Sequence, residues 1–389
     1  MEARRLTPEE RFEAELISTL AFHMRIDDPE KARQESVKAA PEDWGAFAED
    51  GTMAGRIINH RFESYLDGQL IVNGGIGAVS TLPEYRNAGA IRAIFERLLP
   101  QAYRDGQVIS TLYPFSHAFY RKFGYETACW KSVYAFAPGV LREYGFTGRA
   151  VQWKPGDPAG EYAALYDRFA SGFNLAIRRD EDRMLKHLQG EWYKDRKFCY
   201  MLYEGEKPVA YLIFQDVRRD PAALLSVQDL AWEGRAGLRA ILGFLARFSA
   251  DYGRIELFLP NCVELFSVLH SPQAYDIEKS THQDYMIRVV NARRLLACIK
   301  KPADRAFTIG VTDPLIEENN GVWRVHGDAV EAASEAPDLR VSVQALGQLA
   351  AGCVSLAEAA YRDDVEILNN RETLERVFVR KPVFVAEHF

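Results

Sequence analysis

The stretch IVNGGIGAVSTLPEYRNAGAIRAIFERLL at 71–99, followed by VISTLYPFSHAFYRKFGY at 108–125, decides the fold. Its first part, Ile71–Thr81, is a mostly apolar strand pattern that ends before Pro83, because proline cannot donate to a β-ladder. A second apolar run, Val108–Tyr113, predicts another strand. An amphipathic segment separates the two runs, so the order strand, helix, strand predicts an α/β unit.

The segment Arg86–Arg92 connects the first strand to this helix. Its helical pattern places one apolar face at Ile91, Ile94, Phe95, Leu98, Leu99 and Ala102. A helix that starts at Ala88 or Gly89 leaves backbone N–H groups unpaired at the positive end of its dipole. Glycine lets a ligand approach the backbone, and Arg86 and Arg92 add positive charge. The segment is therefore a candidate phosphate site, with an ordinary strand–helix turn as the alternative.

The second part of the stretch carries a tyrosine on a short helix. Ser116 is suited to cap a helix from about His117 to Phe123, and Gly124 fits its C-terminal stop. Tyr120 lies one turn into that helix. Two interpretations stay open for it: a reactive side chain, or a core tyrosine whose hydroxyl has a partner. A further strand is expected over Glu126–Phe136.

Length and charge limit the class of protein. A chain of 389 residues is too long for one hydrophobic core and predicts two or three domains. The formal net charge of −7 argues against a nucleic-acid partner. No apolar run reaches membrane-spanning length, so no membrane partner is expected. Near the start, Thr7, Pro8 and Glu10 form a capping-box pattern that predicts a folded helix rather than a signal peptide.

Cysteine and histidine usage gives two further expectations. The five cysteines are scattered and lack Cys-x-x-Cys spacing, which favours a reduced, cytoplasmic protein. The eight histidines show no metal-ligand spacing, so no metal is expected. The glycines at 74–77 lie inside a strand pattern and not after one, so they form no dinucleotide fingerprint. They indicate instead a bulge or a close backbone approach.

The order strand, turn, helix, glycine, strand, proline recurs about 148 residues later. In this second copy Ala236-Gly237 takes the place of Ala88-Gly89, and the strand Arg254–Leu259 takes the place of Val108–Tyr113. The segment after Pro260 contains no counterpart of the tyrosine. Residues 151–288 are therefore expected to repeat the scaffold without its site, with chance similarity between two α/β units as the alternative.

The last hundred residues follow a different pattern. We expect strands at Phe307–Val311, Val322–His326 and Leu339–Ser342, and helices at Val343–Ala351, Ser355–Tyr361 and Arg371–Arg376. This arrangement predicts a small α+β domain. The final segment Pro382–Phe389 is unusually apolar, so we expect it to dock as a strand or plug.

Together these features resemble the GNAT superfamily of acyl-CoA-dependent N-acetyltransferases. The superfamily's phosphate turn reads Arg/Gln-x-x-Gly-x-Gly/Ala, and Arg86 and Gly89 match its first two fixed positions. Ile91 departs from the small third residue. The segment FYRKFGY at 119–125 matches the superfamily's closing Tyr-x-x-x-Gly-Phe/Tyr motif. The two motifs occur in the expected order along the chain.

Two such units and a small α+β domain resemble the enhanced intracellular survival (Eis) group of N-acetyltransferases, whose third domain is like sterol carrier protein. The resemblance implies an α/β (α+β) fold with tandem GNAT-type domains. The first, 1–150, would be catalytic and bind acetyl-CoA, and the second, 151–288, would be degenerate. The sterol-carrier-protein-like domain would span 289–389. The resemblance also implies a homo-oligomer, expected to be a hexamer.

The resemblance assigns roles to particular residues. Acetyl-CoA would be the co-substrate, Tyr120 the acid and the α-carboxylate of Phe389 the base. The implied acyl-CoA contacts are Val79, Ser80, Thr81, Arg86, Asn87, Ala88, Gly89, Ala90, Ile91, Arg92, Phe115 and Ser116. An α-carboxyl has a pKa of about 3.3–3.7 and is a weak base, so holding the amine is an alternative role. A backbone N–H near Val79 or Ser80, at an expected bulge, would stabilise the oxyanion.

These assignments predict a function. The protein is expected to transfer an acetyl group to a primary amine of a cationic small molecule, aminoglycoside- or polyamine-like, or to a lysine side chain. The amine would attack the thioester directly. Candidate substrate contacts are Asp27, Asp28, Asp43, Trp44 and Glu387, although the aspartates also suit loop and helix-cap positions. The alternative function is a non-catalytic acyl-CoA sensor or lipid-binding module.

Overall fold

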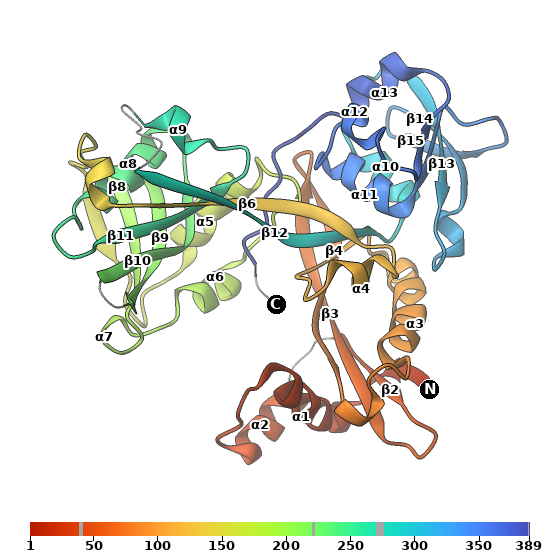
Figure 1. Cartoon of the computed structure of the whole chain (residues 1–389), viewed down its shortest axis with the longest axis horizontal. Helices are drawn as coiled ribbons and strands as arrows, with labels where there is room; N and C mark the ends of the chain where they lie inside the picture. Colours follow the sequence, from red (N-terminus) through yellow and green to blue (C-terminus); the bar gives the residue numbers. More distant parts are fainter. Residues whose placement is uncertain (39–41, 220–221, 270–275, 388) are drawn as a thin grey trace. The chain divides into compact units, whose positions relative to one another are not determined.

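The computed structural model describes the chain except residues 39–41, 220–221, 270–275 and 388. The described residues divide into two compact units. Unit 1 comprises Met1–Ala128, Asp284–Lys381 and Glu387–Phe389, and unit 2 comprises Cys129–Gln283 and Pro382–Ala386. Residues from the first and third predicted domains thus form one unit (Figure 1).

Unit 1 contains a twisted sheet in the order β1-β2-β3-β4-β5-β12. Neighbouring strands are antiparallel except β4 and β5, which are parallel and joined by the crossover helix α3. The strands are β1 (Glu2–Arg5), β2 (Glu42–Phe47), β3 (Met53–Leu66), β4 (Gln69–Thr81), β5 (Ile109–Leu112) and the end of β12 (Ile277–Val289), and α3 spans Ala90–Arg104.

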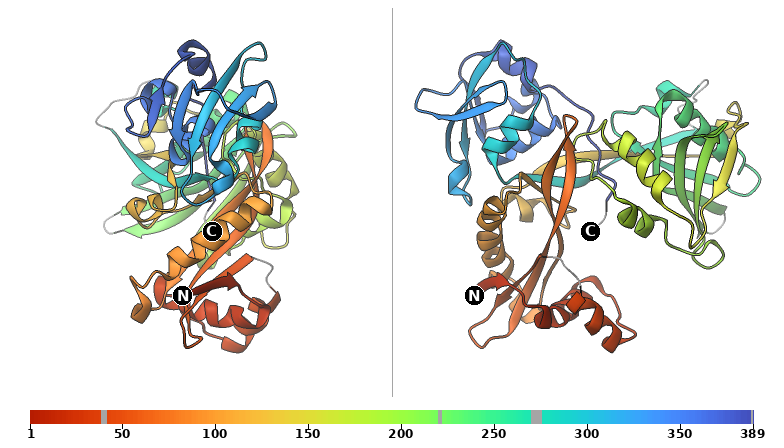
Figure 2. Two further views of the ribbon diagram at one scale, coloured as in Figure 1. Left: turned by 90° about the vertical axis from the view of Figure 1, so that its right-hand side faces the viewer. Right: turned by 180° about the vertical axis from the view of Figure 1, so that it is seen from behind.

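Helix α3 packs on this sheet by the face that the sequence predicts. The expected apolar residues, from Ile91 to Ala102, are all buried. They form one core cluster with Trp44, Ile57 and Ile76 from the strands. Figure 2 shows α3 lying beside β3 and β4 from two sides. The amphipathic interpretation of this segment is therefore confirmed.

Shorter elements complete the first part of unit 1. Helix α4 (His117–Arg121) follows β5 and is capped by Ser116, as expected. The N-terminal capping box is also present: η1 (Pro8–Glu10) leads into α1 (Arg11–Phe22). Helix α2 (Pro29–Lys38) follows α1. Strand β6 (Glu126–Phe136) has the predicted bounds.

Unit 2 has a sheet of the same design, in the order β6-β11-β10-β9-β8-β7. Its one parallel pair, β10 and β11, is again joined by a crossover helix, α8. The two units therefore share one succession of strand pairings. The further elements are β7 (Arg149–Gln152), β8 (Lys197–Glu204), β9 (Lys207–Arg219), β10 (Ala222–Trp232), β11 (Arg254–Pro260), η3 (Pro138–Leu141), α5 (Gly160–Ala170), α6 (Glu181–Leu188), α7 (Trp192–Asp195), α8 (Gly234–Ala246) and α9 (Leu265–Val268).

A five-stranded sheet in the order β15-β14-β13-β16-β17 forms the rest of unit 1. Helices α10 to α13 gather on one side of it (Figures 1 and 2). The predicted strands and helices are present, and the short edge strands β15 and β17 add to them. The elements are α10 (Ala292–Cys298), β13 (Ala306–Thr312), η4 (Glu317–Asn319), β14 (Gly321–His326), β15 (Ala329–Ala333), β16 (Leu339–Ser342), α11 (Val343–Ala351), α12 (Leu356–Ala359), β17 (Val365–Ile367) and α13 (Arg371–Val377).

The apolar final segment is docked, as expected. Within unit 2, the backbone N–H of Asn174 donates to Pro382 (2.9 Å), and the N–H of Phe384 donates to Asn174 (3.1 Å). The ring of Phe384 packs against Phe169 and Phe173. The segment forms only an isolated bridge there and not a longer strand. Residue 388 lies outside the described residues.

Candidate active site

The α-carboxyl group of Phe389 lies against strand β4 within unit 1. A methyl group built on Gly77 would lie 3.0 Å from the carboxyl carbon and 3.2 Å from its oxygen. A methyl group on Gly75 would lie 2.9 Å from the Phe389 ring. The glycines that the sequence places inside this strand therefore leave room for the end of the chain, in line with the close approach expected there.

Aromatic side chains surround the Phe389 ring. Its centroid lies 4.9 Å from that of Phe62, 6.0 Å from that of His60 and 6.2 Å from that of Tyr285. His60 and Phe62 project from the same face of β3, because strand side chains alternate. The sequence analysis did not find these residues. The alternation could have pointed to His60 and Phe62, but the position of Tyr285 depends on the long-range pairing of β12 with β5.

A β-bulge adjoins the carboxyl group. Gly77 pairs with Ile58 and Ser80 pairs with Arg56, so Ala78 and Val79 together oppose a single residue of β3. Ala78 has a φ of +50°, which is rare for a residue with a side chain. Bulges of this kind redirect backbone groups and are common beside active sites. The expected bulge is present, and the oxyanion role of its N–H groups stays a prediction.

Tyr120 is held in an aromatic environment and is only 2% exposed. Its ring lies 5.1 Å from that of Phe115 and 5.2 Å from that of Phe119, centroid to centroid. Among the residues that the structure describes, none forms a hydrogen bond with its hydroxyl group. Burial, with a smaller contribution from Tyr125, raises the pKa of the Tyr120 hydroxyl above its ordinary value. The group therefore stays protonated and has a free donor for a ligand.

The neighbouring Tyr125 is a core tyrosine whose hydroxyl has a hydrogen-bond partner, which was the alternative interpretation of Tyr120. Its hydroxyl lies 2.7 Å from Ser110 Oγ, which donates to the carbonyl oxygen of Gly74 at 2.8 Å. Tyr125 is fully buried, and this burial raises the pKa of its hydroxyl. The two tyrosines thus differ in that only Tyr125 has its hydrogen bond within the fold.

The phosphate-turn candidates lie on an open turn. η2 (Pro83–Tyr85) precedes it, Asn87 has a φ of +64°, and Gly89 has a φ of +88° at the N-cap of α3. A methyl group on Gly89 would meet no atom within 4 Å, so the backbone there is accessible. The exposed turn residues are Arg86, Asn87, Ala88, Gly89 and Arg92.

The family's phosphate turn has a small residue at its third fixed position, where this chain has Ile91. The larger side chain is accommodated because it is buried. Ala90 and Ile91 face the core of unit 1, where an aliphatic side chain is accommodated. Arg92 lies 5.8 Å from the centroid of the Phe123 ring and 3.7 Å from Glu96. Among the other acyl-CoA candidates, Phe115 is 68% exposed, Val79 and Thr81 are half-buried, and Ser80 is buried. Ser116 uses its hydroxyl to cap α4.

Two of the substrate candidates have structural roles instead. The Asp43 carboxylate is buried on β2 and accepts hydrogen bonds from Arg56 at 2.8 and 3.1 Å. It therefore caps no helix and offers no open carboxylate to an amine. Trp44 is 6% exposed and belongs to the core cluster under α3, so it presents no open ring face for stacking. These two expectations are wrong. The two residues are consecutive on β2 and point to opposite faces of the sheet, and each face is covered, by the Arg56 pair next to α1 on one side and by the α3 cluster on the other.

The other acidic candidates lie in two places. Asp28 precedes α2 and accepts a hydrogen bond from the backbone N–H of Lys31 at 3.0 Å, so it acts as a helix cap. Asp27 beside it is exposed. Glu387 is buried two residues before Phe389. Contact of these three residues with a substrate stays a prediction.

The helix start in unit 2 differs from that in unit 1 by its acidic N-cap. Glu233 occupies the N-cap of α8 directly after β10. Its carboxylate pairs with Lys207 Nζ and with Arg168 Nε, each at 2.6 Å. The hydrogen bonds from Lys207 and then Arg168 lower the pKa of Glu233. The start of α8 thus carries a carboxylate that is paired with two cations and makes no cap hydrogen bond, although a methyl group on Gly234 there would also meet no atom within 4 Å.

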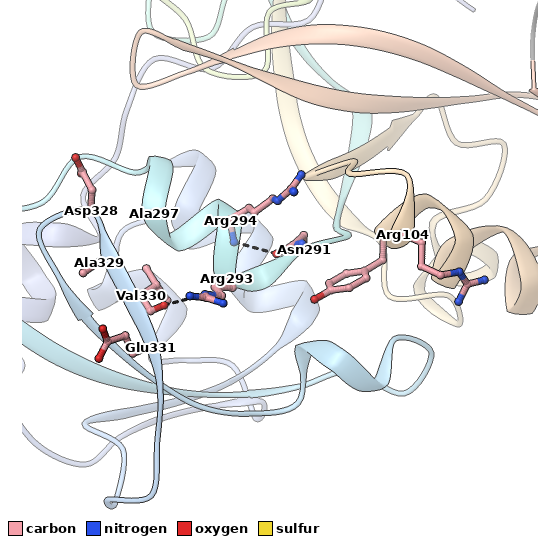
Figure 3. A pocket seen from close by; sticks show the side chains of 10 residues that line it. Arg104, Asn291, Arg293, Arg294, Ala297, Asp328, Ala329, Val330 and Glu331 are labelled. Atoms are coloured by element: carbon pink, nitrogen blue, oxygen red, sulfur yellow. Dashed lines mark hydrogen bonds between the residues drawn. The ribbon is translucent and has the colours of Figure 1, made fainter.

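One pocket of about 620 Å³ lies elsewhere in unit 1, between the end of α3, α10 and β15 (Figure 3). Arg293 Nε donates to the carbonyl oxygen of Val330 at 2.8 Å in its wall. None of the residues discussed above lines it. Its lining residues are Tyr103, Arg104, Asn291, Arg293, Arg294, Ala297, Asp328, Ala329, Val330 and Glu331.

Among the described residues, no group of three or more His, Cys, Asp or Glu side chains is arranged to hold a metal ion. No helix among the described residues has the length and apolar character needed to span a bilayer.

Comparison with known proteins assigns both parts of unit 1. Residues 2–128 match the family model of the acetyltransferase (GNAT) domain, and residues 288–386 match that of the sterol carrier protein domain. No curated protein matches the chain.

Solved structures share the fold over the whole chain. A GCN5-related N-acetyltransferase from Anabaena variabilis ATCC 29413 is 18% identical, with a TM-score of 0.86 and full coverage of both chains. A probable N-acyltransferase from Enterococcus faecalis V583 is 17% identical, with a TM-score of 0.87 and coverage of 100% of this chain and 99% of that one. Eis1 from Mycobacterium abscessus is 20% identical, with a TM-score of 0.83 and full coverage of both chains. The chain therefore joins a GNAT acetyltransferase domain at residues 2–128 to a sterol carrier protein domain at residues 288–386, and it is an acyltransferase of the GNAT type.

Proposed function

We propose that this protein is an acetyl-CoA-dependent N-acetyltransferase that acts on a primary amine of a cationic small molecule or of a lysine side chain. The observation that carries the proposal is the position of the Phe389 carboxyl group at Gly77, beside the bulge of β4. It places a negative charge next to the strand along which a thioester would lie. A cationic amine is the substrate that such a charge favours.

The turn Arg86–Arg92 would hold the pyrophosphate of acetyl-CoA. It combines an accessible backbone at Gly89 with the start of a fifteen-residue helix, whose dipole favours an anion. Arg86 and Arg92 add charge on either side. The thioester would then reach the bulge, where the N–H of Val79 or Ser80 would stabilise the developing oxyanion.

Tyr120 would stabilise and protonate the leaving thiolate. Burial keeps its hydroxyl protonated, and the hydroxyl has no partner among the described residues. Its raised pKa makes it a weaker acid than a free tyrosine. A hydrogen bond to the developing thiolate charge is therefore its first contribution, and proton transfer completes the step.

The α-carboxylate of Phe389 would receive the amine. A carboxylate with an ordinary pKa of about 3.3–3.7 removes a proton from an ammonium inefficiently. Its charge, together with the rings of Phe62 and Tyr285, would mainly bind and orient the ammonium form, which then loses one proton to water to become the attacking amine. The amine nitrogen then attacks the thioester carbon, the C–S bond breaks, and the amine proton leaves to the carboxylate or to water.

The test is a thiol-release assay with acetyl-CoA against polyamines, aminoglycosides and lysine peptides. Tyr120→Phe should lower turnover at least about 100-fold, because it removes the proposed acid. Tyr144→Phe is the matched control, since the Tyr144 hydroxyl donates to Val268 in unit 2. Acetyl-CoA binding without thiol release from any amine would favour the acyl-CoA sensor. Absence of both would remove the support for an enzyme.

A second experiment tests the role of the Phe389 α-carboxylate in turnover. Extra residues fused after Phe389 should abolish turnover, whereas the same residues fused before Met1 should not. Equal activity of the two fusions would contradict the role of the carboxylate. The homohexamer is a further prediction from the family resemblance. The scattered cysteines predict the cytoplasmic location, and the need to bind a cation predicts amine contacts of Asp27, Asp28 and Glu387.

A further inference from the structure

The sterol carrier protein domain contacts the chain immediately after Tyr120. Three side chains of that domain, which we call the brace, donate hydrogen bonds to backbone carbonyl groups there. Gln344 Nε2 donates to Arg121 (3.2 Å), Arg288 Nε to Phe123 (3.0 Å) and Gln348 Nε2 to Thr127 (2.6 Å). All of these atoms belong to unit 1.

The segment that the brace contacts cannot be rigid by itself. Helix α4, which carries Tyr120, has only five residues, and helices of this length are unstable alone. Carbonyl groups at the end of a helix also lack partners within it. Leaving them buried without donors would be costly. Gln344 and Arg288 supply donors at this end of α4. Gln348 supplies one at the start of β6, and Ser116 caps the other end of α4.

Gly124 allows the brace to come close. Its φ of +84° is a left-handed conformation that favours glycine. A methyl group at this position would lie 3.2 Å from Val343 Cγ1 and 3.3 Å from Arg288 Nε. The glycine of the tyrosine motif is therefore also a packing requirement for the domain that follows.

The Arg288 side chain is held in place by an ion pair within the sterol carrier protein domain. Its guanidinium pairs with Asp313 at 2.6 Å, and both side chains are completely buried. The second carboxylate oxygen of Asp313 accepts from Asn319 Nδ2 at 2.8 Å. Because a buried ion pair tolerates little displacement, the position of the Phe123 carbonyl is fixed by the core of the sterol carrier protein domain.

We propose that Arg288, Gln344 and Gln348 are positioning residues for acetyl transfer, and that the sterol carrier protein domain sets the orientation of Tyr120 through them. The inference rests on the acid role of Tyr120 in the proposed function. It gives the third domain a part in the reaction that requires no ligand of its own. The brace touches no reacting atom and acts through α4.

A double-mutant cycle tests this inference. Gln348→Leu removes the donor to Thr127, and we expect kcat to fall about 10-fold with little change in the KM for acetyl-CoA. In a Tyr120→Phe background the same change should alter kcat less than about two-fold, because the group that it positions is gone. Thr308→Val is the control, since the Thr308 side chain bonds only within its own domain.

Two further variants refine the test. Gln348→Glu keeps an acceptor for Arg362 Nη1, which now donates to Gln348 Oε1 at 3.0 Å, but loses the donor to Thr127. It should behave like Gln348→Leu. Gln344→Ala changes a half-buried side chain and keeps the cycle measurable if Gln348→Leu fails to fold.

The outcomes separate the two proposals. An equal loss of kcat in both backgrounds, or no loss in either, would overturn the positioning role. Wild-type activity of Tyr120→Phe alone would instead overturn the acid role in the proposed function. A loss that disappears in the Tyr120→Phe background supports both.

Discussion

The carboxyl group of Phe389 lies against the backbone of Gly77, and this contact brings the last residue of the chain to a strand of the first domain. It depends on glycine, because a side chain at position 77 would occupy the place of the carboxyl group. The same strand has glycine at positions 74 and 75, where a methyl group would collide with Gln107 and Phe62. The glycine-rich strand is therefore required by packing on both of its faces.

Gly77→Ala should lower turnover without unfolding the enzyme. The added methyl group would lie 3.0 Å from the carboxyl carbon, so the end of the chain must shift by a few tenths of an ångström. Because a displacement of about 1 Å in a catalytic group can lower turnover about 100-fold, this smaller shift should lower it less, about 10-fold. Thiol release and thermal unfolding should be measured together. Gly139→Ala is the control, because its methyl group would meet nothing within 4 Å. Normal turnover of Gly77→Ala would contradict the placement of the carboxylate.

Arg86→Gln should weaken acetyl-CoA binding and leave kcat nearly unchanged. Arg86 is exposed on the proposed phosphate turn, so its contribution would be a screened charge interaction. We expect the KM for acetyl-CoA to rise several-fold at low salt, and the difference from the wild type to shrink in about 1 M salt. Arg97→Gln, on the exposed side of the same helix, should have no effect. Equal shifts for both variants would mean that only overall charge matters.

Local features of the fold could be read from the sequence, because they depend on neighbouring residues. The buried face of α3, the Ser116 cap and the bounds of β6 follow from spacing, capping chemistry and β-propensity. The bulge at Ala78 could be anticipated from the glycines around it. Each of these signals lies within a few residues of the feature that it predicts.

Features set by long-range pairing could not be read in this way. Asp43 is neutralised by Arg56 only because β2 and β3 pair in one register, and no local pattern fixes that register. Tyr285 reaches the site because β12 pairs with β5, far away in sequence. Strand β6 follows the strands of unit 1 in the sequence but pairs with β11 in unit 2, whereas the end of β12 follows the strands of unit 2 but pairs with β5 in unit 1. No local sequence pattern predicts this exchange.

Asp43→Asn should destabilise the fold and leave substrate binding intact. The Asp43 and Arg56 side chains are nearly completely buried, so the change leaves the more exposed Glu15, at 2.7 Å, as the charged partner of Arg56. Breaking such a pair typically costs about 3–5 kcal/mol, which urea unfolding would detect. Arg340→Gln, in an exposed pair with Glu366, should cost less than about 1 kcal/mol. A raised amine KM without loss of stability would instead place Asp43 at the substrate.

The pH dependence of turnover should show no basic limb from Tyr120. Burial raises the pKa of its hydroxyl, so the protonated form, which is the proposed donor, persists beyond the ordinary value of 10. Turnover should therefore rise with pH as the amine loses its proton, with no decline up to about pH 10. Tyr120→Phe should lower the whole profile and keep its shape. If the wild type instead shows a decline below pH 10 that Tyr120→Phe lacks, the hydroxyl ionises in the working range. Tyr120 would then be more exposed during turnover than in this structure.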